Sequence, residues 1–187
     1  MTFEMILGIV LAGVLSNNYA LLHFLGTGAV LENERSTKKS LVLGLGTTVV
    51  MVISTLITWP LNRFVLAKAQ YLQTMAFVVV VLIVVETIHV IAKNLLDNYC
   101  RSDFVKFAIN GAVLGLCIHN TELTFGEAVV TAAAVGIGFM LTMTLYAKLK
   151  DVPVDEEAIP ASFRGLPIAL LTAGMIVLAL MALQFKF

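Results

Sequence analysis

Hydrophobic residues in this chain gather in six long runs, and short segments rich in charged residues or proline separate them. Most runs reach about 20 residues, the length that a helix needs to cross the ~30 Å hydrocarbon core of a bilayer. The second run is expected to end at Pro60, because proline cannot continue the backbone hydrogen bonding of a helix. The pattern therefore predicts six spanning helices, at about residues 5–30, 40–59, 71–92, 104–119, 125–149 and 166–185.

The overall composition supports a membrane location. Hydrophobic residues make up 59% of the chain and charged residues only 13%, and the mean hydropathy is +0.96. Soluble domains carry about a quarter charged residues, so this composition indicates an integral membrane protein. No connecting segment is long enough to build a soluble core, which predicts a single membrane domain over residues 1–187. The net charge of +0 and the lack of a basic block argue against a nucleic-acid partner.

Lysine and arginine are unevenly distributed between the two sides of the predicted bundle. The loops after the first, third and fifth helices hold nine of these residues, and the opposite side holds three, Arg63, Lys68 and Lys186. Cytoplasmic loops of membrane proteins carry the excess of Lys and Arg. The distribution therefore predicts that the odd-numbered loops face the cytoplasm and that both termini lie outside.

The two halves of the chain, about 1–92 and 93–187, match each other at an offset of 92 residues without a gap. The matched pairs include Asn18 with Asn110, Gly44 with Gly136, Gly46 with Gly138 and Met51 with Met143. Because each half holds three helices, the second copy must enter the membrane from the opposite side. The sequence therefore predicts an all-α membrane protein of six helices in two inverted three-helix repeats, with the working site near the midplane.

The matched glycines have a structural interpretation. Small residues allow helix backbones to approach closely, where van der Waals contacts and hydrogen bonds hold helices together in a membrane. Gly44, Gly46, Gly136 and Gly138 are therefore expected to be packing positions. The alternative is a role in ion passage at the interface between the repeats.

Asparagines lie inside two of the apolar runs, next to or shortly before glycine. Asn17 and Asn18 precede Gly26 in the first run, and Asn110 is followed by Gly111 in the fourth. An amide in hydrocarbon costs several kcal/mol unless it is hydrogen-bonded, and an interrupted helix leaves backbone groups that need partners. These residues therefore predict that helices 1 and 4 are broken near the midplane. The alternative is that the asparagines form hydrogen bonds between intact helices.

The third run contains two ionisable residues. Glu86 and His89 are three residues apart and so share one side of a helix. A carboxylate within an apolar span is costly and suggests a function, here a path for a proton or a cation. The alternative is that the pair reaches the cytoplasmic interface near Lys93. Neither His23 nor His119 has a second His or Cys at ligand spacing, so no metal site is predicted.

Four motifs together carry a resemblance to a known family. The segments SNNYALLHFLG, YLQTMAFVVVVLIVVE, NGAVLG and PASFRGLPIALLTAGMI resemble the Rnf–Nqr family of membrane subunits, and within it the A-type subunit of the Rnf electron transport complex. The resemblance implies a subunit of a redox-driven complex that moves Na⁺ or H⁺ and lies in the prokaryotic inner membrane. It also implies an inverted homologous partner of the E type, together with other Rnf-type subunits, and no catalysis by this chain alone.

The resemblance implies a cofactor that this chain does not match. In the family, one cysteine from each broken helix ligates a [2Fe–2S] cluster shared with the partner. The corresponding positions here are Gly28 and Gly111, which have no sulfur to offer. Cys117 lies about 9 Å further along a helix from Gly111, and Cys100 lies in a charged linker, so neither is expected to substitute.

Three interpretations of this departure are open. The favoured one is a cluster-free relative in which electrons take another route, so that no cofactor is expected from this chain's own ligands. The others are a cluster held by different groups and a cysteine-depleted engineered version. A different class of function is also open, namely a cofactor-free inverted-repeat transporter or channel, or a structural assembly subunit.

Overall fold

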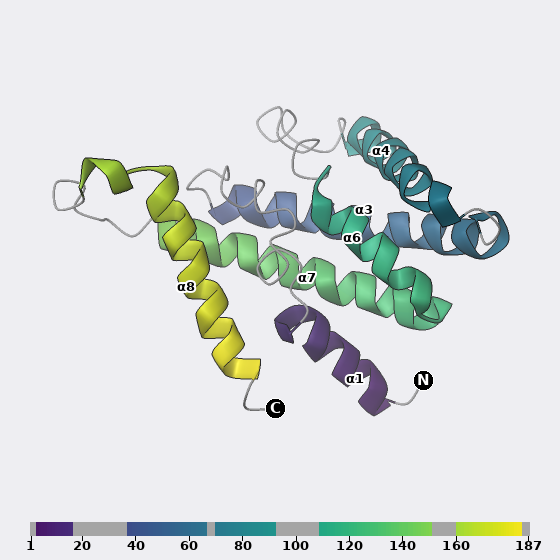
Figure 1. The fold of residues 1–187 in the computed structure, drawn as a ribbon, viewed down its shortest axis with the longest axis horizontal. Coiled ribbons are helices and arrows are strands. Elements are labelled where there is room, and N and C mark those ends of the chain that lie inside the picture. Colours follow the sequence, from purple (N-terminus) through teal and green to yellow (C-terminus); the bar gives the residue numbers. More distant parts are fainter. Residues whose placement is uncertain (1–2, 17–36, 67–69, 93–108, 151–159, 185–187) are drawn as a thin grey trace.

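The computed structural model describes residues 3–16, 37–66, 70–92, 109–150 and 160–184 (Figure 1). These parts of the chain are helical and contain no strand. The helices are α1 (Phe3–Leu11), η1 (Ala12–Ser16), α3 (Thr37–Phe64), η3 (Gln70–Leu72), α4 (Gln73–Ala92), α6 (Gly111–His119), η4 (Asn120–Glu122), α7 (Phe125–Lys150), η5 (Ala161–Phe163) and α8 (Leu166–Gln184).

Three helices within the described ranges are long and apolar enough to cross a membrane: Ser40–Phe64, Gln73–Ile91 and Phe125–Leu149. They coincide with the second, third and fifth predicted spans, which confirms that these three runs form apolar helices of sufficient length. The segments Glu4–Val14 and Pro167–Ala179 are shorter apolar helices. The first and fourth predicted spans lie partly outside the described residues, so the full set of six spans stays a prediction.

The end of the second predicted span is wrong by about one turn. Helix α3 passes through Pro60 and continues to Phe64. Proline removes a single N–H donor from the helix ladder, and the ladder resumes beyond it, since the Val65 N–H donates to the Leu61 carbonyl at 3.0 Å. The loss of one hydrogen bond near the end of a long helix is therefore insufficient to stop it.

Helices α3 and α7 form the centre of the molecule and run antiparallel, with α4 on one side of the pair and α1 and α8 on the other (Figure 1). A methyl group at Gly44 would lie 2.7 Å from Met140 Cγ, and one at Gly136 would lie 2.5 Å from Thr48 Cγ2. These separations leave no room for a side chain. The predicted packing role of Gly44 and Gly136 is therefore confirmed.

The same kind of contact joins α7 to the N-terminal segment. A methyl group at Gly138 would lie 3.0 Å from the Gly13 carbonyl oxygen and 3.0 Å from Val14 Cα. Gly13 in turn lies against Ala134, whose Cβ would be 2.7 Å from an added methyl group. The packing role predicted for Gly138 is confirmed, and α7 is the element against which both α3 and η1 pack closely.

The α3–α7 contacts are reciprocal. An offset of 92 residues carries Gly44 to Gly136 and Thr48 to Met140. The contact of Gly44 with Met140 therefore maps onto the contact of Gly136 with Thr48. The neighbouring elements follow the same exchange, because α1 packs against α7 and α6 packs against α3.

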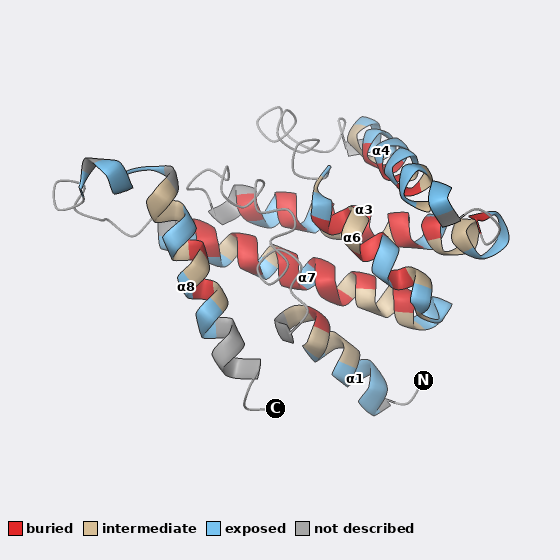
Figure 2. Ribbon diagram, viewed as in Figure 1, coloured by how far each residue is buried: buried red, intermediate tan, exposed pale blue. Residues whose placement is uncertain are grey.

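Buried side chains concentrate on α3, α6 and α7 (Figure 2). The largest fully buried ones include Tyr146, Phe77, Phe139, Leu43 and Met51. Many large apolar side chains elsewhere are exposed, most visibly on α1 and α4. Exposed apolar surface of this extent fits an environment of lipid or of partner subunits rather than water.

Candidate functional site

The residues predicted to mark the two broken helices are described only in the second half of the chain. Asn17, Asn18, Gly26 and Gly28 lie outside the described residues. Asn110 lies at the start of α6 with extended backbone angles (φ −128°, ψ 158°). Its side-chain oxygen accepts a hydrogen bond from the Val113 N–H at 3.1 Å.

This bond is a helix N-cap. The first N–H groups of a helix lack partners within it, and an asparagine side chain placed just before the first turn satisfies one of them. Asn110 therefore satisfies a backbone group at the start of α6, while its predicted place in a helix broken near the midplane stays a prediction. Gly111 follows as the exposed first residue of α6.

The donor set around α6 does not fit an iron–sulfur cluster. Such clusters are held by cysteine thiolates, with histidine as an occasional replacement. Gly111 offers no donor, and Cys117, near the other end of this nine-residue helix, is a free, buried thiol. Within the described ranges, no three His, Cys, Asp or Glu side chains come together as a metal-binding group. Cys100 lies outside those ranges.

Cys117 instead belongs to a group of buried polar side chains, which we name the buried polar cluster. Its five members come from α3, α6 and η4, and each is at most 1% exposed: Ser54, Thr55, Thr58, Cys117 and Asn120. The Cys117 thiol lies near the hydroxyl groups of Thr55 and Thr58. Cys117 is therefore a buried thiol with polar as well as apolar neighbours.

Asn120 ties three elements together within this cluster. Its Nδ2 donates to Thr55 Oγ1 at 3.2 Å, which links η4 to α3, and to the Ala128 carbonyl at 3.2 Å, which links η4 to α7. Asn120 also follows directly on His119 as the C-cap of α6. On α3, the Thr58 hydroxyl donates to the Ser54 carbonyl oxygen at 2.8 Å.

Two oxygen atoms of the cluster have no hydrogen-bond partner among the residues that the structure describes. They are Ser54 Oγ and Asn120 Oδ1, and both are fully buried. The orientation of the Asn120 amide follows from its neighbours, because the Ala128 carbonyl requires a donor and only Nδ2 can supply one. A buried polar atom left without a hydrogen bond costs about 1–3 kcal/mol, so each such atom calls for an explanation.

The sequence reasoning missed this cluster. Ser54, Thr55 and Thr58 lie in the second apolar run, where hydroxyl groups commonly bond to carbonyls of their own helix. Asn120 lies at the edge of the fourth run, where a polar residue is typical of the start of a loop. The available signal was an asparagine directly after a short apolar helix, together with three hydroxyl residues within five positions.

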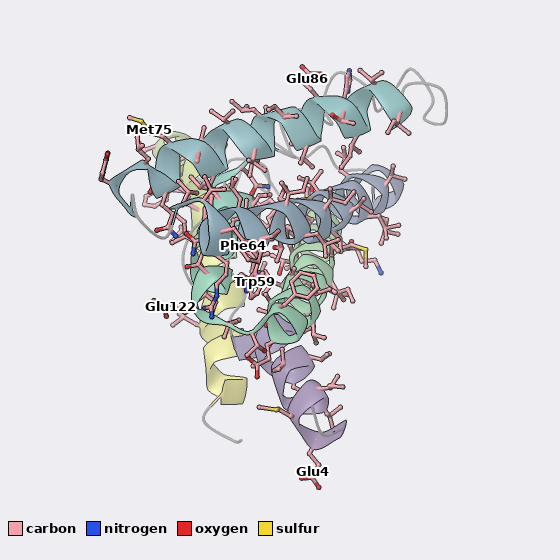
Figure 3. All side chains as sticks on the ribbon, turned by 90° about the vertical axis from the view of Figure 1, so that its right-hand side faces the viewer. Glu4, Trp59, Phe64, Met75, Glu86 and Glu122 are labelled. Carbon is pink, nitrogen blue, oxygen red and sulfur yellow. The ribbon has the colours of Figure 1, made fainter. Side chains whose placement is uncertain are left out.

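A cavity of about 920 Å³ opens beside the cluster, where α3 ends and α7 begins. Its lining includes Trp59, Arg63, Gln73, Glu122 and Phe125. The Trp59 indole N–H donates to the Leu123 carbonyl at 2.9 Å, and its ring meets the Phe125 ring edge-on at 5.2 Å. Figure 3 shows Trp59 and Glu122 at this end of the molecule.

Glu86 and His89 lie on α4, away from this cavity. Glu86 is exposed and lies on the side of α4 that points away from the other helices, as does Met75 (Figure 3). His89 is half-buried. The structure therefore leaves the predicted ion-path role of this pair as a prediction.

Comparison with known proteins gives independent evidence of the family to which the chain belongs. The family described as "Rnf-Nqr subunit, membrane protein" matches residues 6–186. The chain is 34% identical to the A-type subunit of the ion-translocating oxidoreductase complex of Syntrophotalea carbinolica, over 92% of this chain and 93% of that protein. The corresponding A-type subunits of Cronobacter sakazakii and Pectobacterium carotovorum are 31% and 33% identical, over 90% of both chains in each case. The protein therefore belongs to the Rnf–Nqr family of membrane subunits.

Proposed function

We propose that this chain is an A-type membrane subunit of an ion-translocating oxidoreductase complex, in which electron transfer drives Na⁺ or H⁺ across the membrane. The observation that carries the proposal is full-length similarity to proteins with this name, at 34% identity over 92% of the chain. Chemistry in such complexes belongs to cofactors, and the protein supplies position and electrostatics. The chain is expected to catalyse nothing alone.

The proposed architecture is six helices in two inverted repeats. The reciprocal contacts of Gly44 with Met140 and of Gly136 with Thr48 support it, because a two-fold relation between the halves would produce such an exchange. The antiparallel course of α3 and α7 agrees with opposite insertion of the two copies. Helix α6, only nine residues long and capped by Asn110, fits one half of a broken fourth helix.

The proposed orientation follows from the distribution of Lys and Arg, which places both termini and the cavity end of α3 outside the cytoplasm. We assign the outward side of α4 to contact with an inverted E-type partner. The support is Glu86, an exposed carboxylate among exposed apolar side chains such as Met75 and Ile83. A carboxylate facing lipid is costly, whereas a partner protein or an ion path would supply polar neighbours.

A second candidate is a cofactor-free transporter that retains the same scaffold. The observation in its favour is glycine at positions 28 and 111, where the family resemblance implies cluster cysteines. This candidate predicts ion movement without electron input, whereas the main proposal predicts movement only during electron transfer.

Inverted membrane vesicles from the native host test the proposal. Vesicles from the wild type, from a deletion strain and from a complemented strain would be compared for ion uptake driven by a reduced donor. The proposal predicts uptake that needs both the donor and this chain. Uptake that follows an imposed ion gradient equally well without a donor would favour the transporter instead, and unchanged donor-driven uptake in the deletion strain would overturn the proposal.

A further inference from the structure

We propose that the buried polar cluster is a binding site for a monovalent cation of the size of Na⁺, with Ser54 Oγ and Asn120 Oδ1 as side-chain ligands. The site rests on the proposed function only for the choice of Na⁺ as the ion carried. The geometric argument rests on the two oxygens themselves, which are buried and accept no hydrogen bond from any residue that the structure describes.

One oxygen belongs to the amide that bonds Thr55, and the other belongs to the residue that precedes Thr55 in α3. Asn120 donates to Thr55 through Nδ2, which leaves Oδ1 of the same amide available to accept. Ser54 is the chain neighbour of Thr55, and its carbonyl oxygen already accepts from Thr58. The Asn120 amide is thus held in place by its two Nδ2 bonds, while its Oδ1 and the Ser54 hydroxyl oxygen remain available.

The C-terminal end of helix α6 favours a positive charge beside Asn120. The carbonyl end of a helix carries a partial negative charge, equivalent to about half an electron, that attracts cations. Asn120 is the residue that caps this end of α6. In membrane transporters, the C-terminal ends of short helices and neutral oxygen ligands are the groups that bind Na⁺.

The chemistry of the cluster selects among ions. Divalent cations such as Ca²⁺ and Mg²⁺ are bound through carboxylates, and none of the five cluster members carries one. Hydroxyl and amide groups do not take up a proton near neutral pH. Neutral oxygen ligands in a buried site therefore suit a dehydrated monovalent cation rather than a divalent ion or a proton.

The cavity provides an entrance. Thr58 and Asn120 of the cluster are directly followed in the chain by Trp59 and Thr121, which line the cavity. Among the described lining residues, Glu122 is the acidic side chain and Arg63 the basic one. The cavity is therefore the entrance that the proposal assigns to the ion, because its lining begins one residue beyond the cluster on both α3 and η4.

Thermal unfolding of the purified full-length protein tests the site. The melting temperature would be measured in NaCl, KCl and choline chloride at equal ionic strength, across a range of salt concentrations. A ligand that binds the folded state raises the melting temperature as its concentration exceeds the dissociation constant. The proposal predicts a rise specific to Na⁺.

Substitutions in the buried polar cluster show whether the Na⁺ response arises at this site. Ser54→Ala removes one ligand oxygen and is expected to move the Na⁺ response to about tenfold higher concentration. Thr172→Ala is the matched control, because it removes a hydroxyl on α8 that bonds to the Ile168 carbonyl of its own helix. If Ser54→Ala fails to fold, Ser54→Cys replaces the same ligand oxygen with sulfur, a poor ligand for Na⁺, in a side chain of nearly the same size, and it is expected to weaken the Na⁺ response in the same way.

Equal responses to all three salts, or an Na⁺ response unchanged in both cluster variants, would overturn the proposal and assign the two oxygens to a buried water molecule. The thermal-unfolding measurement depends on neither electron transfer nor ion transport. Its failure therefore leaves the proposed function standing, and failure of donor-driven uptake leaves a measured Na⁺ site standing.

Discussion

Gly44 on α3 lies so close to Met140 on α7 that a methyl group on the glycine would come within 2.9 Å of the methionine Cα. The same relation recurs 92 residues later with the roles exchanged, where Gly136 lies against Thr48. Two helices that meet through one contact and its counterpart behave like the two copies of a symmetric interface. This crossing is the centre of the fold.

Gly136→Ala tests the importance of that crossing. The new methyl group would lie 2.5 Å from Thr48 Cγ2 and 3.0 Å from Thr48 Cα, so the helices must separate. Overpacking of this kind costs about 1–3 kcal/mol. Thermal unfolding in detergent is expected to show a clear loss of stability.

Gly174→Ala on α8 is the matched control for that substitution. A methyl group there has no atom of the described residues within 4 Å, and alanine stabilises a helix interior by up to about 1 kcal/mol over glycine. The control is therefore expected to be neutral or more stable. Equal losses in both variants would contradict a special role for the α3–α7 contact.

Asn110→Ala removes the cap of α6. The Val113 N–H then loses its side-chain partner, and the loss of a helix cap costs about 1 kcal/mol. Faster hydrogen exchange at Val113 and a lower melting temperature are expected. Asn110→Asp retains an oxygen acceptor, so its exchange rate at Val113 and its melting temperature should stay near the wild-type values. A fall in melting temperature as large as that of the alanine variant would count against a capping role.

Glu86→Gln separates stability from function. Because Glu86 is exposed on α4, the substitution is expected to change the stability of the isolated chain by no more than about 0.5 kcal/mol. Donor-driven ion uptake by the assembled complex should fall if the carboxylate serves an ion path. Glu4→Gln, at an exposed position on α1, is the control and should leave uptake unchanged; equal uptake in both variants would remove Glu86 from the path.

Gly28→Cys combined with Gly111→Cys tests the interpretation of the missing ligands. Sulfur at both positions restores the ligand types that the family resemblance implies, so the double variant is expected to gain iron, acid-labile sulfide and the EPR signal of a reduced [2Fe–2S] cluster within the complex. The wild-type complex should lack that signal from this site. A wild-type complex with the full signal would mean that other groups hold the cluster.

Much of the fold was predictable because its strongest signals are local. The runs at 71–92 and 125–149 have sharp polar boundaries, and α4 and α7 follow them closely. Pro60 misled the prediction, since the loss of one donor is a weaker effect than the continued apolar pattern up to Phe64. The packing roles of Gly44, Gly136 and Gly138 were predictable because small residues allow membrane helices to approach closely.

The buried polar cluster was not predictable in the same way. Its central bond joins Asn120 to Thr55, residues 65 positions apart. Neither residue is unusual at its own position, because hydroxyls are common in membrane helices and asparagines are common at helix ends. Only the arrangement of α3, α6 and α7 brings them together, and that arrangement is a property of tertiary packing.

Our main conclusion is that this chain works within a redox-driven complex, and purification from the native membrane is its most stringent test. A tagged full-length chain would be extracted in mild detergent, and its partners would be identified by mass spectrometry and quantified. We expect a stoichiometric homologous membrane protein together with cofactor-bearing redox subunits. A chain that purifies without such partners, from membranes in which donor-driven ion uptake is intact, would contradict the conclusion.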